Sequence, residues 1–250
     1  MKTKVMPRSF RLSPEEDKVL KEKCKELDIS KSEFIKRCIM NKEVYLIRHS
    51  APFVKIDNYE DYKNVPWREF NKNMILSIEG ERRASLLANV PELRKVAHVF
   101  CSNSFRAIGT AKYLSEANNV KLTIDPLLTE REMGVEKISD LDEDFTRKSF
   151  NNKEFKVPTG ESLKETDDRF NKFLAFNLKN EKEPFAVVIH GMMLLSFLQN
   201  YCDFAFDSEY FMISFNGKTL VNGKLLNPDV FKITYNSYNE IINIDRIVVS

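Results

Sequence analysis

The chain has few of the residues that build disulfide frameworks, metal centres or membrane spans. Its 250 residues include only three histidines and four cysteines, and the cysteines show neither C-x-x-C pairing nor the spacing of zinc ligands. The longest apolar run, residues 185–198, is too short to cross a bilayer, and the first ten residues lack the apolar centre of a signal peptide. We therefore expect a globular protein of the reducing cytoplasm with no metal, no cofactor and no membrane contact.

Charge is distributed unevenly along the chain, although the total is nearly balanced. The whole sequence has 39 Lys and Arg against 37 Asp and Glu, and residues 1–42 hold 12 and 7 of these. The remaining 27 basic and 30 acidic residues give the rest of the chain a net charge of −3, against +5 for the first segment. The first 42 residues are therefore expected to form a separate unit.

The first segment has the pattern of one short strand followed by two helices. Residues 8–13 alternate polar and apolar side chains, which is typical of a half-exposed strand. Ser13, Pro14 and Glu16 then supply a helix cap, a proline at the first helical position and a capping-box carboxylate. A second capping box at residues 30–33 precedes the apolar residues of another helix.

This order resembles the ribbon-helix-helix family of DNA-binding proteins, in particular plasmid copy-control and mobilisation proteins. The resemblance implies a homodimer, because two chains of that family pair their strands into a ribbon that enters the major groove of DNA. By position, Ser9 and Arg11 would read bases, and Ser30 and Lys31 would hold a phosphate at the start of the second helix. Asp28 departs from the family pattern, in which a turn glycine is common. A helical hairpin used only for dimerisation is the alternative, since these elements cannot bury a core alone.

From residue 43 onward, strand-like and helix-like patterns alternate, which predicts an α/β sheet covered by helices on both faces. The acidic stretch 134–156 is interpreted as an insertion over the sheet, and residues 230–249 as two antiparallel strands. The alternating segments are 43–49, 80–90, 95–102, 106–118, 121–128, 169–180, 185–190 and 192–201.

Two of the expected strands end in a histidine. The first stops at Arg48 and His49, and the strand 185–190 stops at His190, while Arg106 begins a helix after a third strand. Because ligands of open α/β sheets bind beyond the carboxyl ends of the strands, these side chains are expected to meet. A neutral imidazole is a nucleophile, and guanidinium groups match the paired oxygens of phosphate. The set therefore predicts a metal-independent pocket for a phosphoryl group.

Six motifs in order make this part of the chain similar to the histidine phosphatase superfamily, also called phosphoglycerate mutase-like. The motifs are Arg48-His49-Ser50 and the segments 76–88, 102–111, 127–134, 158–162 and 190–191. The resemblance implies a three-layer α/β/α sandwich over residues 43–250, preceded by the small ribbon-helix-helix unit at residues 1–42.

The resemblance also assigns roles to single residues. It makes His49 the nucleophile that becomes phosphohistidine, and it makes Arg48, Arg106 and His190 a clamp for the phosphoryl oxygens. Glu130 would protonate the leaving oxygen and then help to activate water. The backbone N–H of Met192 would add a further donor. The third histidine, His98, lies inside a strand pattern and is interpreted as structural.

Departures from the family pattern favour one activity over others. Ser50 replaces the common glycine and would add a side chain near the phosphate, and Ala51 and Pro52 stand where mutase-like members have Trp-Asn. We therefore expect hydrolysis of a small phosphorylated metabolite, with specificity from residues 53–78 and 134–160. A DNA-bound regulator that senses a phosphorylated ligand, and a phosphoglycerate mutase, are the alternatives.

Overall fold

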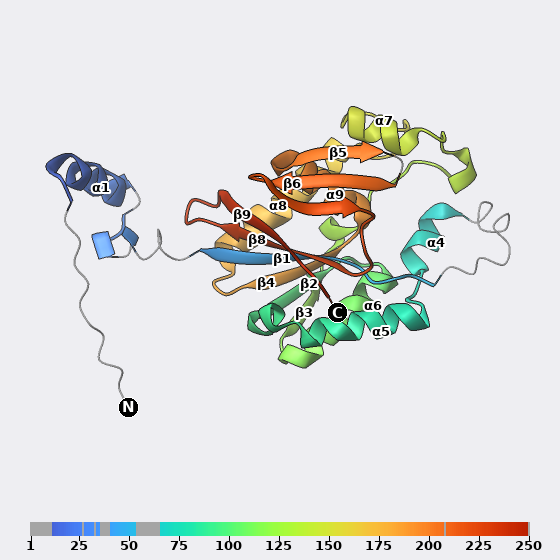
Figure 1. Cartoon of the computed structure of the whole chain (residues 1–250), viewed down its shortest axis with the longest axis horizontal. Helices are drawn as coiled ribbons and strands as arrows, with labels where there is room; N and C mark the ends of the chain where they lie inside the picture. Colours follow the sequence, from blue (N-terminus) through green and yellow to red (C-terminus); the bar gives the residue numbers. More distant parts are fainter. Residues whose placement is uncertain are drawn as a thin grey trace.

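The computed structural model describes residues 12–26, 28–32, 34–35, 41–53, 66–207 and 209–249 (Figure 1). Most of the predicted N-terminal strand, including Ser9 and Arg11, lies outside the described residues. Helix α1 (Pro14–Glu26) begins as predicted: the backbone N–H of Glu16 donates to Ser13 Oγ at 3.2 Å, and the N–H of Ser13 donates to Glu16 Oε2 at 2.7 Å. After α1, Asp28 has a φ of +51°, the left-handed conformation for which glycine is common.

The main sheet has six strands in the order β3-β2-β4-β1-β8-β9. The first four are mutually parallel, whereas β8 runs antiparallel to β1 and β9 antiparallel to β8, as the sequence predicts for the final pair. The strands are β1 (Lys42–Arg48), β2 (His98–Cys101), β3 (Lys121–Ile124), β4 (Phe185–Ile189), β8 (Asp229–Tyr235) and β9 (Ile241–Ile247). The carboxyl ends of β1, β4 and β2 therefore lie along one edge.

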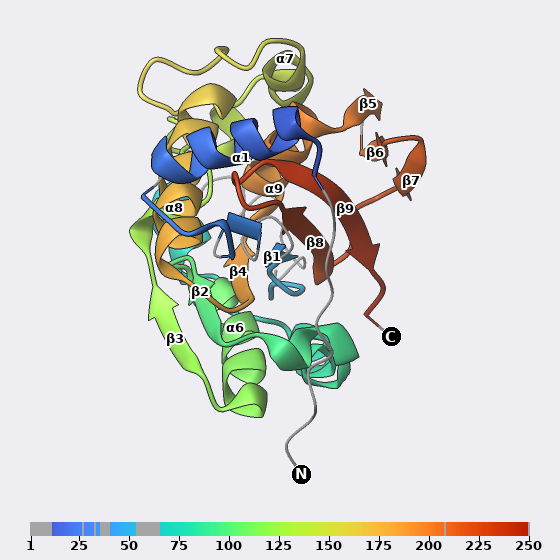
Figure 2. The ribbon, with the colours of Figure 1, turned by 90° about the vertical axis from the view of Figure 1, so that its left-hand side faces the viewer.

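Helices cover both faces of this sheet, so the predicted three-layer sandwich is confirmed (Figure 2). One face carries α8 (Leu163–Asn180) and α9 (Gly191–Tyr201); the other carries α6 (Phe105–Asn118), α5 (Ile78–Ser85) and the 3-10 turns η2 (Leu86–Asn89) and η3 (Pro91–Lys95). Helix α8 begins six residues before the predicted segment, because Ser162 and Glu165 form a complete capping box there.

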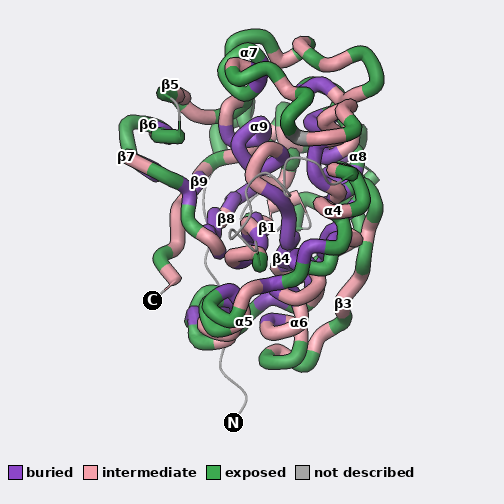
Figure 3. The backbone as a smooth tube through the Cα atoms, turned by 90° about the vertical axis from the view of Figure 1, so that its right-hand side faces the viewer, coloured by how far each residue is buried: buried purple, intermediate pink, exposed green. Residues whose placement is uncertain are grey.

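Side chains along each central strand alternate between two hydrophobic cores. Val44 and Leu46 of β1 face the core built with α8 and α9, whereas Tyr45 and Ile47 face the core built with α6. All four are fully buried, and Figure 3 shows buried residues gathered in β1, β4, β8 and α9. No helix among the described residues has both the length and the apolar character needed to cross a membrane.

A second sheet of three antiparallel strands was not predicted. It consists of β5 (Asp203–Asp207), β6 (Tyr210–Phe215) and β7 (Lys218–Gly223), in that order. Asn216 and Gly217 join the last two strands with φ of +49° and +78°, which is the turn chemistry of a tight hairpin. Figure 1 shows this sheet on the same side of the molecule as α7 (Phe145–Asn151), the helix of the predicted insertion. The remaining short elements are α4 (Trp67–Asn73), η4 (Pro126–Leu128) and η5 (Ile138–Asp140).

Gly80 of α5 packs closely against Ala51 in the loop after β1. A Cβ on Gly80 would lie 2.0 Å from the carbonyl oxygen of Ala51, which also accepts hydrogen bonds from Ser77. Alanine in an open helix position would stabilise by about 1 kcal/mol, but this contact forces backbone to shift. We expect Gly80→Ala to lower the free energy of unfolding by about 1–3 kcal/mol in urea titrations.

The matched control is Arg83→Ala, an exposed position on the same helix, which we expect to change stability by less than about 1 kcal/mol. A Gly80→Ala protein as stable as the parent would contradict the packing described for this loop.

Candidate active site

The pairing of β1 with β4 places two histidines side by side. Arg48 is in register with Ile189, so the next residue of each strand is His49 and His190. The ring centroids lie 5.1 Å apart with planes at 61°, and both side chains are buried. The backbone N–H of His49 extends the ladder by donating to Ile189 O at 2.9 Å. The structure thus brings together the two histidines that the sequence predicts at this edge.

Arg106 joins the two imidazoles from the first turn of α6. Its Nε donates to His49 Nε2 at 3.0 Å, and its Nη2 lies 2.9 Å from His190 Nδ1. Asn71 of α4 accepts from the other side of the guanidinium, through its backbone oxygen and through Oδ1, which lies 2.8 Å from Nη2. The sequence did not identify Asn71, since no motif marks its segment and the contact spans 35 positions.

Hydrogen bonds define which ring nitrogen carries the proton in each histidine. His49 Nδ1 lies 2.8 Å from the carbonyl oxygen of Ser50, which can only accept, so this nitrogen is the donor. Nε2 therefore keeps its lone pair, which faces the Arg106 N–H. His190 has the opposite tautomer, because Nδ1 accepts from Arg106 and Nε2 donates to Ser102 Oγ at 2.8 Å. Ser102, the partner of His190 Nε2, belongs to the motif 102–111, but the sequence did not predict this contact.

Both histidines are held in the neutral form. Burial, and then the positive charge of Arg106, lower the pKa of His49 well below its ordinary value of 6.5. The same two causes, in the same order, lower the pKa of His190. A neutral imidazole keeps one unprotonated ring nitrogen, and this is the form that acts as a nucleophile.

The loop after His49 is fixed by three polar contacts. The N–H of Ser50 donates to Thr110 Oγ1 at 2.9 Å, and Asn227 Nδ2 donates to the carbonyl of His49 at 2.8 Å. The hydroxyl of Ser50 donates to Gly80 O at 2.7 Å, so this side chain points into the start of α5. The expectation that Ser50 adds a side chain near the phosphate is therefore wrong, because that hydroxyl is committed to a backbone carbonyl.

Arg48 has a buried donor that lacks a partner. Its Nη1 donates to the carbonyls of Leu225 and Leu226 at 3.1 and 3.3 Å, while Nε has no hydrogen-bond partner among the described residues. A Cβ on Gly191 would lie 3.3 Å from that Nε, so the glycine of the late motif leaves room beside the guanidinium. An unpaired buried N–H costs about 1–3 kcal/mol, which an incoming anion oxygen would recover.

Glu130 lies at the start of α9. Its carboxylate accepts from the backbone N–H groups of Met192 and Met193 at 3.2 and 3.3 Å, and from that of Arg131 at 2.9 Å. The predicted donor Met192 therefore points at the predicted acid. Negative charge is favoured at this helix end, where free N–H groups gather.

Arg131, which the sequence did not single out, anchors this acid to the insertion. It is buried, and its guanidinium donates to Ser149 Oγ at 2.7 Å and to the carbonyl of Phe155 at 3.0 Å. Burial lowers the pKa of Arg131 to about 10, so the side chain stays charged at neutral pH.

Comparison with known proteins agrees with this geometry. The sequence profile of the histidine phosphatase superfamily (branch 1) matches residues 44–216. The chain belongs to this family. The profile of mobilization protein NikA matches residues 3–56, which include most of the segment 1–42 that resembles ribbon-helix-helix proteins and extend through β1.

Relatives of the phosphatase domain are distant. The probable phosphoglycerate mutase GpmB of Yersinia enterocolitica is 31% identical over 128 residues, which cover 48% of this chain and 59% of that protein. Its counterpart from Escherichia fergusonii is 27% identical over 162 residues, covering 61% and 71%. The mycobacterial glucosyl-3-phosphoglycerate phosphatase has the same fold, with a TM-score of 0.60 and 16% identity over 82% of this chain and 97% of that one.

A cavity of about 900 Å³ includes part of this candidate site. Arg48, His49 and Glu130 line it, together with residues of α7 and of the second sheet. Among the aromatic residues of the two segments expected to give specificity, Phe150 lines this cavity, whereas the ring of Phe145 packs 5.7 Å from that of Phe155. Tyr59 and Tyr62 lie outside the described residues. The walls from the second sheet were missed because its strands were not predicted.

A smaller cavity of about 430 Å³ is also lined by this carboxylic acid. Glu130 lines both cavities, and the smaller one also contains Asn71, Thr129 and Trp67. The described part of the phosphatase domain has no group of three or more histidine, cysteine or acidic side chains arranged to hold a metal ion.

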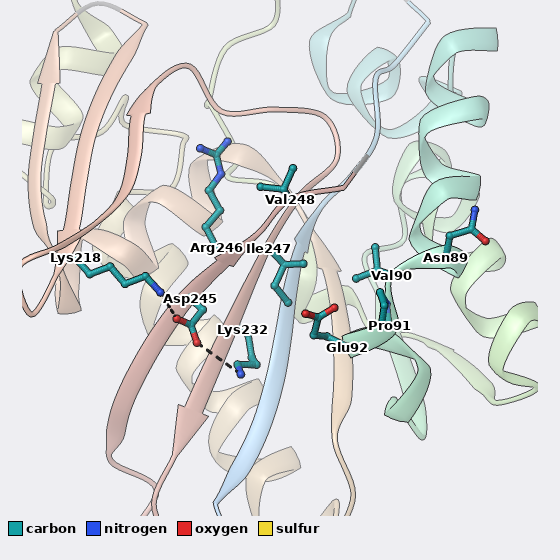
Figure 4. A pocket seen from close by; sticks show the side chains of 10 residues that line it. All are labelled: Asn89, Val90, Pro91, Glu92, Lys218, Lys232, Asp245, Arg246, Ile247 and Val248. Atoms are coloured by element: carbon teal, nitrogen blue, oxygen red, sulfur yellow. Dashed lines mark hydrogen bonds and ion pairs between the residues drawn. The ribbon is translucent and has the colours of Figure 1, made fainter.

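The hollow in Figure 4 lies elsewhere, between residues 89–92 and strands β8 and β9. Its basic groups are already paired: Lys218 with Asp245 at 2.6 Å, Lys232 with the same carboxylate at 3.6 Å, and Arg246 with Asp229 at 2.8 Å. As far as the described residues go, this hollow therefore has no unpaired cation for a phosphate and includes none of the predicted site residues.

The predicted phosphate contact of the N-terminal unit is only partly described. Lys31 forms an ion pair with Asp17 of α1, so its charge already has a partner, and Ser30 accepts from the N–H of Phe34 at 2.9 Å. His98, interpreted as structural, bonds Glu181 at 3.0 Å and Thr123 at 2.8 Å, away from the site.

The lowered pKa values predict how stability depends on pH. As the pH falls below about 6.5, the unfolded chain protonates both histidines, while the folded site keeps them neutral. The free energy of unfolding should therefore decrease toward acid by about 1.4 kcal/mol per pH unit for each histidine, with no such contribution above pH 6.5.

Urea titrations between about pH 7.5 and pH 5 measure this slope. The variant His190→Asn keeps an oxygen that can accept from Arg106 but removes one titrating group, so its slope should fall by the equivalent of one proton. An unchanged slope in that variant would contradict the assignment.

Proposed function

We propose that residues 43–250 hydrolyse a small phosphomonoester through a phosphohistidine formed on His49. The observation that carries the proposal is the lone pair of His49 Nε2, fixed by the Ser50 carbonyl on one side of a neutral, buried ring. Arg106 and Arg48 place guanidinium groups at this site, and the part of the chain that the structure describes leaves Arg48 Nε without a partner. A phosphoryl group is the ligand that this combination fits.

In the first step, His49 Nε2 attacks phosphorus and the bond from phosphorus to the ester oxygen breaks. The alcohol oxygen leaves with a proton from the carboxyl group of Glu130, which lines the large cavity. Arg48 and Arg106 donate to the phosphoryl oxygens as charge builds up on them. His190 Nδ1 accepts from Arg106 in this structure, so His190 joins this clamp only by taking up a proton when the dianion binds. In this step the Arg106 N–H groups exchange their imidazole acceptors for phosphoryl oxygens.

In the second step, a water molecule loses a proton to the Glu130 carboxylate and attacks phosphorus, while the bond from phosphorus to Nε2 breaks. Inorganic phosphate and the free imidazole result. Glu130 borders both the large cavity and the smaller polar one, so water has a route to it while an alcohol occupies the larger space. This second route favours transfer of the phosphoryl group to water over its return to a bound sugar acid or glyceric acid, as a mutase would require.

The N-terminal unit is proposed to form a homodimer that contacts DNA in the cytoplasm. Supporting features are the NikA match, the net charge of +5, the capped start of α1 and the left-handed residue Asp28 between the helices. With both proposals together, the protein would be a phosphatase carried on a DNA-binding head.

Replacement of His49 tests the nucleophile. In EDTA, the intact protein should hydrolyse para-nitrophenyl phosphate, and His49→Ala should reduce the rate at least about a thousandfold. The control His98→Ala alters a histidine outside the site and should retain the rate. Tight phosphate binding by the parent without hydrolysis would instead support a sensor of phosphorylated ligands.

Replacement of Glu130 by glutamine tests the acid and base roles separately. With an alkyl phosphate, Glu130→Gln should lose about 10²- to 10⁴-fold in rate, because the leaving oxygen needs a proton. With para-nitrophenyl phosphate the first step needs none, so a burst of one nitrophenolate per site should precede slow turnover. Rapid-quench and stopped-flow absorbance measure the two phases. Equal losses with both substrates and no burst would contradict the roles given to Glu130.

A gel-shift series tests the head. The intact protein should bind duplex DNA with an affinity that falls as salt rises, whereas a chain without residues 1–42 should not bind, and Arg11→Ala should bind more weakly. Binding that is absent or insensitive to salt in the intact protein would leave dimerisation as the role of this unit, which sedimentation measurements would report.

A further inference from the structure

The large cavity has an aromatic wall that the reaction itself does not use. We define this wall as Phe150 of α7, Phe206 of β5 and Phe211 of β6. The rings of Phe206 and Phe211 stack with centroids 5.0 Å apart, and the ring of Phe150 lies 5.1 Å from that of Phe206. Phe206 is partly exposed, whereas the other two are buried behind it. Such a wall favours a flat apolar group in contact with it.

The mouth of the same cavity has an excess of negative charge. We define its rim by five charged residues: Glu143, Asp144, Arg147, Glu209 and Lys224. Two ion pairs, Arg147 with Asp144 at 2.6 Å and Lys224 with Glu209, cancel two of the three carboxylates. Among the described residues the rim therefore keeps one net negative charge, at Glu143, which repels a second anionic group on a ligand.

The volume of the cavity also exceeds the needs of a three-carbon phosphate. About 900 Å³ lies near the upper end of the range of small-molecule sites, roughly 300–1,000 Å³. A phosphoglycerate in this space would leave the aromatic wall in contact with water, and its carboxylate would meet the negative rim. Charge, surface and size thus point to the same class of ligand.

We propose that the substrate is a phosphomonoester whose alcohol carries a flat, apolar group that is neutral or cationic, and that the site discriminates against phosphorylated carboxylic acids. This inference rests on the proposed phosphatase function and specifies its substrate class. The phosphate binds at Arg48 and His49, the flat group packs on Phe206, and any cation lies at the rim.

Three esters of one alcohol test the proposal on the intact protein. The esters are 3-phenylpropyl phosphate and its para-carboxyl and para-aminomethyl derivatives, which share a primary alkyl leaving group, so differences in kcat/KM report recognition. The neutral and cationic esters should exceed the carboxylate by roughly tenfold, and the neutral ester should exceed propyl phosphate by roughly 10- to 100-fold.

Two variants locate the cause. Glu143→Lys, at an exposed rim position, should reduce discrimination against the carboxylate ester several-fold, whereas Glu116→Lys, the same charge change on α6 outside the cavity, should not. Phe206→Ala should lower kcat/KM for 3-phenylpropyl phosphate while that for propyl phosphate stays unchanged.

The outcomes separate this inference from the function on which it rests. If all three esters are hydrolysed, with loss of activity in His49→Ala, but at equal rates or with the carboxylate preferred, the substrate class is overturned and the phosphatase function stands. If no ester is hydrolysed, the phosphatase function is overturned. Dissociation constants from calorimetry then test the ligand class. Tighter binding of the neutral and cationic esters than of the carboxylate ester supports the proposed class, and any other order overturns it.

Discussion

The in-register parallel pairing of β1 with β4 is the constraint on which the site depends. Because Arg48 lies opposite Ile189, the residues that leave the sheet next are the two histidines, and their rings meet. A slip of one residue would send one imidazole to the opposite side of the sheet. Both faces of these strands are buried, so apolar residues alone do not distinguish one register from the next. The polar residues at the strand ends do, because a slip would draw the guanidinium of Arg48 into the apolar core. The antiparallel pairing of β8 along the whole of β1 adds a second restraint.

The hydrogen bonds of these buried polar groups, taken together, determine which kind of ligand the site can bind. Two neutral imidazoles can be buried at little cost because each has a donor and an acceptor partner, and Arg106 serves both rings. Arg48 is the exception, with a buried Nε that the described residues leave without a partner. The site therefore holds positive charge that its own acceptors do not fully satisfy, and a dianion is the group that removes this imbalance.

The sequence predicts those site residues at which a short motif coincides with the end of a strand pattern or directly follows it. Arg48, His49, Arg106 and His190 were found because strand patterns and short motifs coincide at those positions, and the structure brings all four to one edge. Asn71 could not be found, since its contact with Arg106 depends on how a seven-residue helix packs and not on any local pattern.

Other misses have different physical reasons. The second sheet carried a readable signal, the Asn216–Gly217 turn between alternating strands, but its strands are half exposed and pack beside the main sheet instead of joining it. The role of Ser50 was mistaken because sequence places a residue near a site without giving the direction of its side chain. Its hydroxyl donates to the carbonyl of Gly80 in α5, a partner that no local sequence pattern indicates.

Recognition and chemistry are mechanically linked through two adjacent residues. Glu130 is the proposed proton donor, and Arg131, next in the chain, donates to Ser149 and lies 4.6 Å above the ring of Phe145, both in α7. The same helix carries Phe150 of the aromatic wall. A ligand that packs well against this wall therefore stabilises the position of α7, and α7 in turn holds Arg131 and the neighbouring Glu130. Binding energy from a part of the substrate remote from phosphorus can thus be used to position the proton donor. A ligand too small to reach the wall would leave that link unsupported and would lose turnover as well as affinity.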